Sequence, residues 1–465
     1  MTRRIAIVGG GISGLTAAYR LRRALGDDTE IDLFDSGAHM GGLLRTADVG
    51  GRMVDVGAEA FVVRRPEALG LVRELGLEDR IVSPTARRPA VWSDDRLHPL
   101  PAPAVMGIPA SAEVVAGLAD AGDLARMADE ADRPLSWRVG EDRSIGDLVA
   151  DRFGPSVVAR SVDPMLGGVY ASLSRDIGVR EAVPALVDQL DGGAASLTAA
   201  VDAVQAAGAG ATGPVFGTLV GGYRVLVDAL IASAGIVPRA GATVNSVHER
   251  ADGWTVGVCD ETPVDYDGVV LAVPAGVAGA LLSEEHPDVG GALCDVPRAS
   301  SMVVSIALEP GTPLPDHSGV LVATDAGLRA KAFTFSSQKW AHLSGDGGPV
   351  SVRASFGRYG APVPTPAEEP EVDQRIRVQA CEDLDRVCAA AGVEAPSRRI
   401  LDVETYRWNG GLPVYRPGHL AAMSTVQRAR PRRLVLAGSA YAGVGVPACI
   451  GQAGRAAADL IDELT

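Results

Sequence analysis

A glycine turn between a predicted strand and a predicted helix opens this chain and most constrains its fold. The apolar run 5–8 predicts the strand, and apolar residues recur at helical spacing after residue 14. Between them Gly9, Gly11 and Gly14 form a G-x-G-x-x-G turn, and Asp35 closes a second apolar run. Such glycines let a pyrophosphate approach a helix N-terminus, and the carboxylate then binds a ribose hydroxyl. The pattern predicts a dinucleotide-binding βαβ unit, and the carboxylate favours FAD or NAD over NADP.

The length of 465 residues, with 47% hydrophobic and 22% charged residues, predicts a globular protein of about three folding units. A Pro- and Arg-rich stretch precedes residue 110, helical periodicity dominates residues 111–210, and strand patterns return after residue 221. Segment 191–214 consists mainly of Gly, Ala, Ser and Thr, and we expect it to be a mobile loop because such side chains bury little area. No repeat of fixed period occurs.

Composition excludes several classes of function. The formal charge of −15 argues against binding to nucleic acid. The five cysteines form no CxxC pair and the histidines have no metal-ligand spacing, so we expect a reducing, cytoplasmic location and no metal. No apolar stretch reaches the length that spans a bilayer, and we expect at most a weak peripheral contact with membranes. Arg supplies all but two of the 43 basic residues, which is typical of GC-rich coding.

Four features of the sequence, three segments and one strand position, resemble the flavin amine oxidase superfamily. Residues 39–45 (HMGGLLR) resemble the glycine-rich segment that follows the ribose-binding acid there, and residues 50–61 (GGRMVDVGAEAF) resemble the loop that approaches the flavin. Val244 stands at the strand position whose backbone meets the adenine, and residues 436–457 resemble the second flavin motif, whose helix faces the isoalloxazine. These segments imply FAD bound by residues from both ends of the chain.

Further segments narrow the resemblance to the protoporphyrinogen and coproporphyrinogen oxidases. They are 97–101 (LHPLP), 163–171 (DPMLGGVYA), 221–226 (GGYRVL), 269–275 (VVLAVPA), 405–420 (TYRWNGGLPVYRPGHL) and 443–450 (GVGVPACI). The chain departs from the family pattern at Ala448, where the family has Asp, and at Tyr223, where it usually has Met.

The resemblance implies an α/β fold of the amine oxidase or PHBH-like type: a Rossmann-like FAD-binding domain, a mixed-sheet substrate domain and an inserted helical domain. We expect the FAD-binding domain at 1–85, 211–290 and 426–465, the substrate domain at 86–110 and 291–425, and the helical domain at 111–210. The FAD should be held non-covalently, since no Cys lies in the segment GSAYAG, where related amine oxidases attach it. The protein would be a monomer or a homodimer.

The site residues that the turn and the resemblance together predict form two groups. The residues expected to bind FAD are Gly9, Gly10, Gly11, Ile12, Ser13, Gly14, Asp35, Ser36, Gly42, Leu43, Gly57, Ala58, Glu59, Ala60, Val244, Trp408, Gly438, Val444, Gly445 and Val446. Arg88 would bind a substrate propionate, from the strand leading to Leu97, and Gly168 and Tyr170 would line the slot for the macrocycle.

The implied reaction is oxidation of a porphyrinogen, a cyclic tetrapyrrole, in haem biosynthesis, with oxygen as the electron acceptor. Hydride leaves a weak meso C–H bond for the flavin, so no strong protein base is needed and we expect no catalytic side chain. Three such steps make the porphyrin and three molecules of peroxide. We favour coproporphyrinogen III, which carries four propionates and stays in water, over the membrane-partitioning protoporphyrinogen IX.

Two alternatives of other classes stay open at this stage. An amine oxidase shares both flavin motifs but needs aromatic side chains facing the flavin, which Tyr406 and Tyr441 could provide. A binding protein like the GDP dissociation inhibitors has a similar fold without flavin, and the pair Gly41 and Gly42 with the closing glycine motif argue against it.

Overall fold

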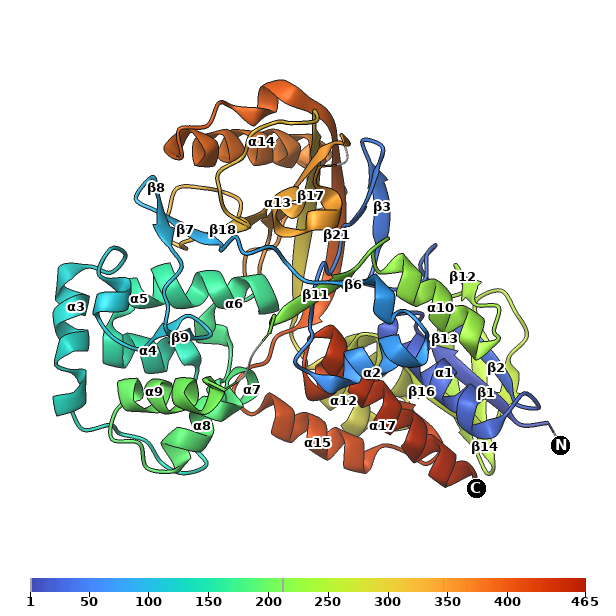
Figure 1. Ribbon diagram of the computed structural model, residues 1–465. Helices are drawn as coiled ribbons and strands as arrows, with labels where there is room; N and C mark the ends of the chain where they lie inside the picture. The colour runs from blue at the N-terminus through green and yellow to red at the C-terminus, as the bar shows by residue number, and fades with distance from the viewer. Residues whose placement is uncertain (1, 211–212, 346) are drawn as a thin grey trace.

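The computed structural model describes residues 2–210, 213–345 and 347–465 and has three groups of secondary structure (Figure 1). A parallel sheet with α1, α10 and α17 lies to the right, a mixed sheet covered by α14 lies at the top, and a helical group lies to the left. The two chain ends meet beside the parallel sheet, where Arg3 Nη2 donates to Leu464 O at 2.9 Å. The α/β fold class predicted from the sequence agrees with this arrangement.

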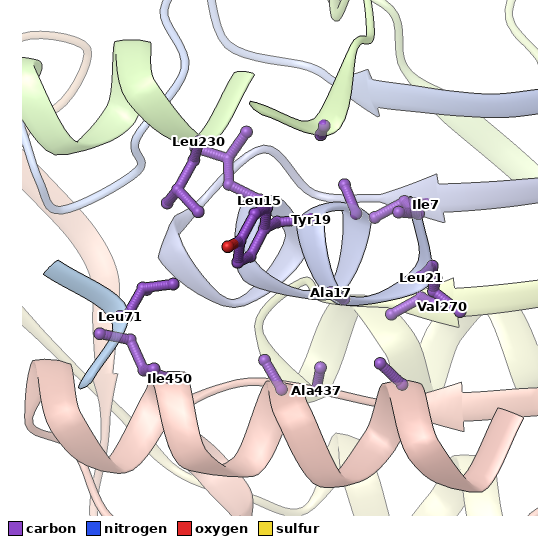
Figure 2. Close-up of a cluster of buried hydrophobic side chains, with 14 of the residues drawn as sticks. Ile7, Leu15, Ala17, Tyr19, Leu21, Leu71, Leu230, Val270, Ala437 and Ile450 are labelled. Atoms are coloured by element: carbon purple, nitrogen blue, oxygen red, sulfur yellow. The ribbon is translucent and has the colours of Figure 1, made fainter. Parts of the chain in front are cut away.

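The parallel sheet has five strands, in the order β12, β2, β1, β16, β22. Their bounds are Arg239–Ala240, Glu30–Asp35, Arg4–Val8, Gly268–Leu271 and Leu434–Leu436. One face is covered by α1 (Ile12–Leu25), α2 (Pro66–Glu74), α10 (Arg224–Ala234) and α17 (Val446–Leu464). Figure 2 shows Leu15 of α1 between Leu230 of α10 and Ile450 of α17, so the first and last helices share one core.

The other face of the parallel sheet packs on an antiparallel meander and three helices. The strands are β13 (Val244–Arg250), β14 (Gly253–Val258) and β15 (Val264–Tyr266), and the helices are α11 (Ala275–Leu282), α12 (Pro287–Cys294) and α15 (His419–Ala429). Smaller pairings join the groups: β3 (Thr46–Val49) with β4 (Arg52–Asp55), and β11 (Phe216–Leu219) with both β5 (Phe61–Val62) and β6 (Ile81–Val82).

The mixed sheet has seven strands, in the order β21, β17, β20, β19, β18, β7, β8. Their bounds are Ile400–Pro413, Arg298–Leu308, Val350–Phe356, Ala332–Thr334, Gly319–Val322, Ala90–Ser93 and Arg96–Pro99. The apolar side chains of one face pack on α14 (Val372–Ala390), and α13 (Ser336–Lys339) follows β19. The side chain of Arg353, on β20, instead reaches the loop after β4, so part of the other face meets the parallel-sheet group.

The helical group has its own hydrophobic core. It contains α3 (Ala121–Ala128), α4 (Ile145–Phe153), α5 (Pro155–Val157), α6 (Asp163–Tyr170), α7 (Val179–Ala182), α8 (Pro184–Asp191), α9 (Leu197–Gly208) and the hairpin of β9 (Ala104–Val105) and β10 (Ile108–Pro109). The division of the chain into domains at the residues given above stays a prediction.

The expected loop at 191–214 is wrong over half of its length, because α9 occupies 197–208. Ser196 caps this helix by accepting from Ala199 N–H at 3.1 Å, and Leu197, Ala200 and Val201 are buried. Ala-rich sequence has high helix propensity, and a few buried side chains suffice to hold the helix against its neighbours. Residues 211 and 212 of the expected loop lie outside the described residues.

Candidate functional site

In the turn between β1 and α1, free space adjoins the backbone at one glycine, Gly11. Gly9 has a φ of 108°, and a Cβ there would lie 2.4 Å from Ala272 O. A Cβ on Gly14 would lie 1.9 Å from Gly9 O, so these two positions need glycine for the chain to fold. A Cβ on Gly11, the N-cap of α1, would meet nothing within 4 Å. A phosphate-bearing ligand can therefore reach the helix N-terminus at Gly11.

Asp35 lies at the end of β2, beside this turn. Its two carboxylate oxygens accept hydrogen bonds from Gly10 N–H at 2.6 Å and from Gly37 N–H at 2.7 Å. The side chain is partly exposed, and each oxygen retains a lone pair for a ribose hydroxyl. Ala242 N–H donates to Asp35 O at 2.9 Å, which brings Val244, the first residue of β13, close to the same edge. The predicted ribose and adenine contacts thus lie together.

Two further loops converge on Gly11. A Cβ on Gly42 would lie 3.2 Å from Gly11 Cα, so the glycine-rich segment after β2 passes directly over the turn. A Cβ on Gly57 would lie 2.0 Å from Leu43 O, which ties the loop after β4 to that segment. The indole N–H of Trp408 donates to the carbonyl of the residue before Gly57 at 3.2 Å. Trp408, on β21, therefore lies against the loop that is predicted to approach the flavin.

The second flavin motif meets the first at the starts of α1 and α17. Gly438, directly after β22, donates its N–H to Gln452 Oε1 at 3.0 Å, and Gly445 is the N-cap of α17. Ser13 and Cys449 lie in the first turns of α1 and α17, two helices whose apolar side chains share one core. Burial raises the pKa of Cys449 to about 11, as expected for a packed thiol. Two helix N-termini thus face the same region, which favours an anionic ligand.

A tyrosine and a histidine support the turn that precedes α17. Tyr415 Oη donates to Ser439 O at 2.5 Å and accepts from Gly443 N–H at 2.7 Å. The His419 ring stacks on Tyr415 at 4.2 Å between centroids. These residues flank α16 (Ser439–Ala442) and belong to segment 405–420, which resembles the porphyrinogen oxidases.

The remaining predicted cofactor residues lie on the same loops and helix starts: Gly10, Ile12, Ser13, Ser36, Ala58, Glu59, Ala60, Val444 and Val446. The described structure gathers all three glycine-rich segments and the closing motif around one region. Each residue's contact with a cofactor stays a prediction.

The three predicted substrate residues lie in two separate places, two of them on α6 and one before β7. Gly168 is exposed on α6, and a Cβ there would come only within 4.0 Å of Leu321 Cδ2, on β18. Tyr170 is buried, with its ring 6.2 Å from that of Tyr415, and burial raises the pKa of Tyr170 to about 12. Arg88 is exposed and precedes β7, so it lies just outside the strand in which it was expected.

Sequence reasoning placed Glu59 on a flavin loop but missed its partners. Lys339 Nζ lies 2.7 Å from Glu59 Oε2, Ser336 Oγ donates to the same carboxylate, and Arg353 Nη1 lies 3.7 Å from Oε1. Burial alone would raise the pKa of Glu59, but Lys339 and Arg353 lower it to about 2. The rarity of lysine was the one available signal, since Lys339 is one of only two in the chain.

Comparison with known proteins identifies the family. The profile of the flavin containing amine oxidoreductases matches residues 12–461. The chain belongs to this family. The match confirms the superfamily and the oxidoreductase class expected from the sequence, and it indicates a flavin cofactor.

Individual relatives cover the whole chain. The coproporphyrinogen III oxidase of Mycobacterium tuberculosis is 46% identical over 468 residues, which cover 99% of this chain and 98% of that protein. The protoporphyrinogen oxidase of Homo sapiens is 27% identical over 503 residues, covering 98% of each chain. A solved structure from Exiguobacterium sp. 255-15, described as a candidate protoporphyrinogen oxidase, superposes with a TM-score of 0.84 at 27% identity, over 100% of this chain and 99% of that one. These matches confirm the resemblance to the porphyrinogen oxidases.

Across residues 2–210, 213–345 and 347–465, no helix combines the length and the apolar character needed to cross a lipid bilayer.

Proposed function

We propose that this protein is an FAD-dependent, oxygen-consuming oxidase of haem biosynthesis that converts coproporphyrinogen III to coproporphyrin III. The overall reaction removes six hydrogen atoms from the porphyrinogen and reduces three molecules of oxygen to hydrogen peroxide. The observation that carries the proposal is the full-length identity of 46% to a coproporphyrinogen III oxidase, joined to the convergence of the flavin segments around Gly11. We propose that the protein works in the cytoplasm, as a monomer or a homodimer.

The arrangement of the site supports non-covalent FAD. The open backbone at Gly11 and the start of α1 fit a pyrophosphate, and Asp35 fits the adenosine ribose. The N-terminus of α17 fits the negative charge that a reduced flavin carries. When bound, FAD supplies a hydride acceptor and passes electrons on to oxygen, which is the chemistry that the proposed reaction needs.

The chain's own residues then have to bind and orient the macrocycle. We propose that Gly168 leaves room for the flat face of the ring next to Leu321, while Tyr170 forms part of the wall. The neighbouring Val169 is 43% exposed, which supports an apolar surface on this side of α6. Arg88 would pair with a propionate, because its guanidinium is exposed and permanently charged.

Steady-state kinetics with both porphyrinogens tests the substrate. We expect kcat/KM to be at least about tenfold higher for coproporphyrinogen III than for protoporphyrinogen IX, a difference of about 1.4 kcal/mol in transition-state stabilisation. The assay is run in one detergent-free buffer and again with lipid vesicles. A higher kcat/KM for protoporphyrinogen IX under both conditions would contradict the proposal. It would favour protoporphyrinogen as the substrate, as in the name of the human relative, a protoporphyrinogen oxidase.

Replacing Arg88 with Ala should raise KM for coproporphyrinogen III by about 10- to 100-fold, since a charge-assisted hydrogen bond contributes about 1.5–3 kcal/mol. The rate of flavin reduction at saturating substrate should change much less, because the lost contact is uniform binding. Arg87→Ala is the matched control: Arg87 is the preceding residue and pairs with Asp316 at 2.7 Å on the surface. Equal KM values for the two variants would contradict the assignment of Arg88 to the substrate site.

A further inference from the structure

A buried charge cluster holds the loop that is predicted to face the flavin. The Glu59 side chain is only 10% exposed and lies between Lys339, on α13, and Arg353, on β20. Arg353 makes a second contact with this loop, because Nη2 donates to Gly57 O at 2.5 Å. The two cations come from the mixed-sheet group: Lys339 lies 280 positions after Glu59, and Arg353 lies 296 positions after Gly57. The cluster therefore fixes the loop relative to the sheet that we assign to the substrate.

The identity of Lys339 is unusual for this chain. Arg supplies every other basic residue except Lys331, so Arg is the default cation here. The Lys339 side chain is 22% exposed, and its ammonium makes a direct 2.7 Å contact with a single carboxylate oxygen. A lysine places a compact point charge there, whereas a guanidinium spreads its charge over a planar fork. Lys339 thus brings a localised positive charge close to Glu59.

Other ionisable groups surround the cluster. Asp55 accepts from Thr46 Oγ1 at 2.7 Å and from Tyr223 N–H at 3.0 Å, and burial raises its pKa to about 6. His342 lies near the cluster too; burial lowers its pKa and therefore favours the neutral ring. Lys339 and Glu59 are consequently two opposite, fixed charges in a poorly solvated region, where a charge acts over a longer range than in water.

We propose that Lys339 and Glu59 form a positioning pair that sets the place of the flavin loop and biases the reduction potential of the bound flavin in opposite directions. The inference rests on the proposed function, since it requires a flavin beside residues 57–60. A positive charge near a flavin stabilises the reduced, more negative form, and a negative charge destabilises it. Lys339 should raise the potential, and Glu59 should lower it.

Four variants of the FAD-loaded protein separate this role from a purely structural one. The variants are Lys339→Met, Glu59→Gln, the double variant and Lys339→Arg, and the readouts are the flavin midpoint potential, the visible spectrum and the FAD dissociation constant. We expect the potential to fall in Lys339→Met, to rise in Glu59→Gln and to return close to the wild-type value in the double variant. Lys339→Arg should keep the potential near wild type, because it keeps the charge.

The signs of these shifts decide the outcome. Potentials that move in the same direction in both single variants, or that stay unchanged, would overturn the charge-setting role. Because Lys339→Met removes the nearer of the two cations beside the buried Glu59 carboxylate and leaves only Arg353, at 3.7 Å, that variant can fail to fold. The double variant avoids this problem because it removes both charges together. If Lys339→Met does not fold, the test compares the flavin potentials of the single variants Glu59→Gln and Lys339→Arg: the first should be raised and the second should stay near wild type. A wild-type protein that binds no flavin would instead contradict the proposed function.

Discussion

Replacing Gly11 with Val should yield a folded protein that binds flavin at least about 100-fold more weakly than the wild type, a loss of about 2.7 kcal/mol or more. Gly11 has a φ of −72°, which any residue adopts, and a Cβ there would meet no protein atom within 4 Å. The added side chain would instead fill the space proposed for the pyrophosphate. The measurements are visible flavin absorbance per protein and the thermal unfolding of the protein freed of flavin.

Two other glycines serve as controls for this substitution. Gly14→Val should not fold correctly, because its Cβ would lie 1.9 Å from Gly9 O. Gly70→Val, in α2, should keep full flavin, because the space beside Gly70 is open and belongs to no proposed site. Retention of stoichiometric flavin by Gly11→Val would contradict the assignment of this turn to the cofactor.

The parts of the fold that the sequence predicted depend on local patterns. The strand–turn–helix at the N-terminus has clear apolar periodicity and glycines in fixed positions, and β1 and α1 are found at Arg4–Val8 and Ile12–Leu25, where the sequence predicts them. The need for glycine at position 14 is predicted by the G-x-G-x-x-G pattern itself, and the structure gives the reason: no other residue fits beside Gly9 O. The resemblance added the connection between these distant segments, which spacing alone could not provide.

The parts that the sequence did not predict depend on contacts between distant residues. Segment 191–214 looked like a loop because small side chains were judged unable to offset ordering entropy, yet Leu197 and Val201 bury fully against the helical core. The partners of Glu59 lie more than 270 positions away, and the rarity of lysine, the one signal at Lys339, does not indicate which carboxylate it contacts. Side-chain networks between groups of elements need the fold before they can be seen.

The helical group contains a buried ion pair whose loss should strongly reduce the stability of the protein. Arg152 Nε lies 2.8 Å from Glu130 Oε1, and the two side chains are 5% and 0% exposed. Arg152 also donates to backbone carbonyls, including that of Pro134 at 3.0 Å. Glu130 accepts from Leu197 N–H at 2.8 Å, so the pair connects α4 to the start of α9.

Arg152→Met should reduce the free energy of unfolding by about 3–5 kcal/mol, because it leaves the Glu130 carboxylate buried without its cation. If segment 111–210 is a separate domain, as we propose, urea should unfold this segment first while the flavin absorbance persists. Limited proteolysis should then cut within 111–210.

The matched control is Arg138→Met. Arg138 belongs to the same helical group, but its side chain is 91% exposed and lies 3.9 Å from Glu141. Its loss should therefore change the free energy of unfolding by less than about 1 kcal/mol. Simultaneous loss of flavin and of the helical group in Arg152→Met would instead mean that both unfold as one cooperative unit.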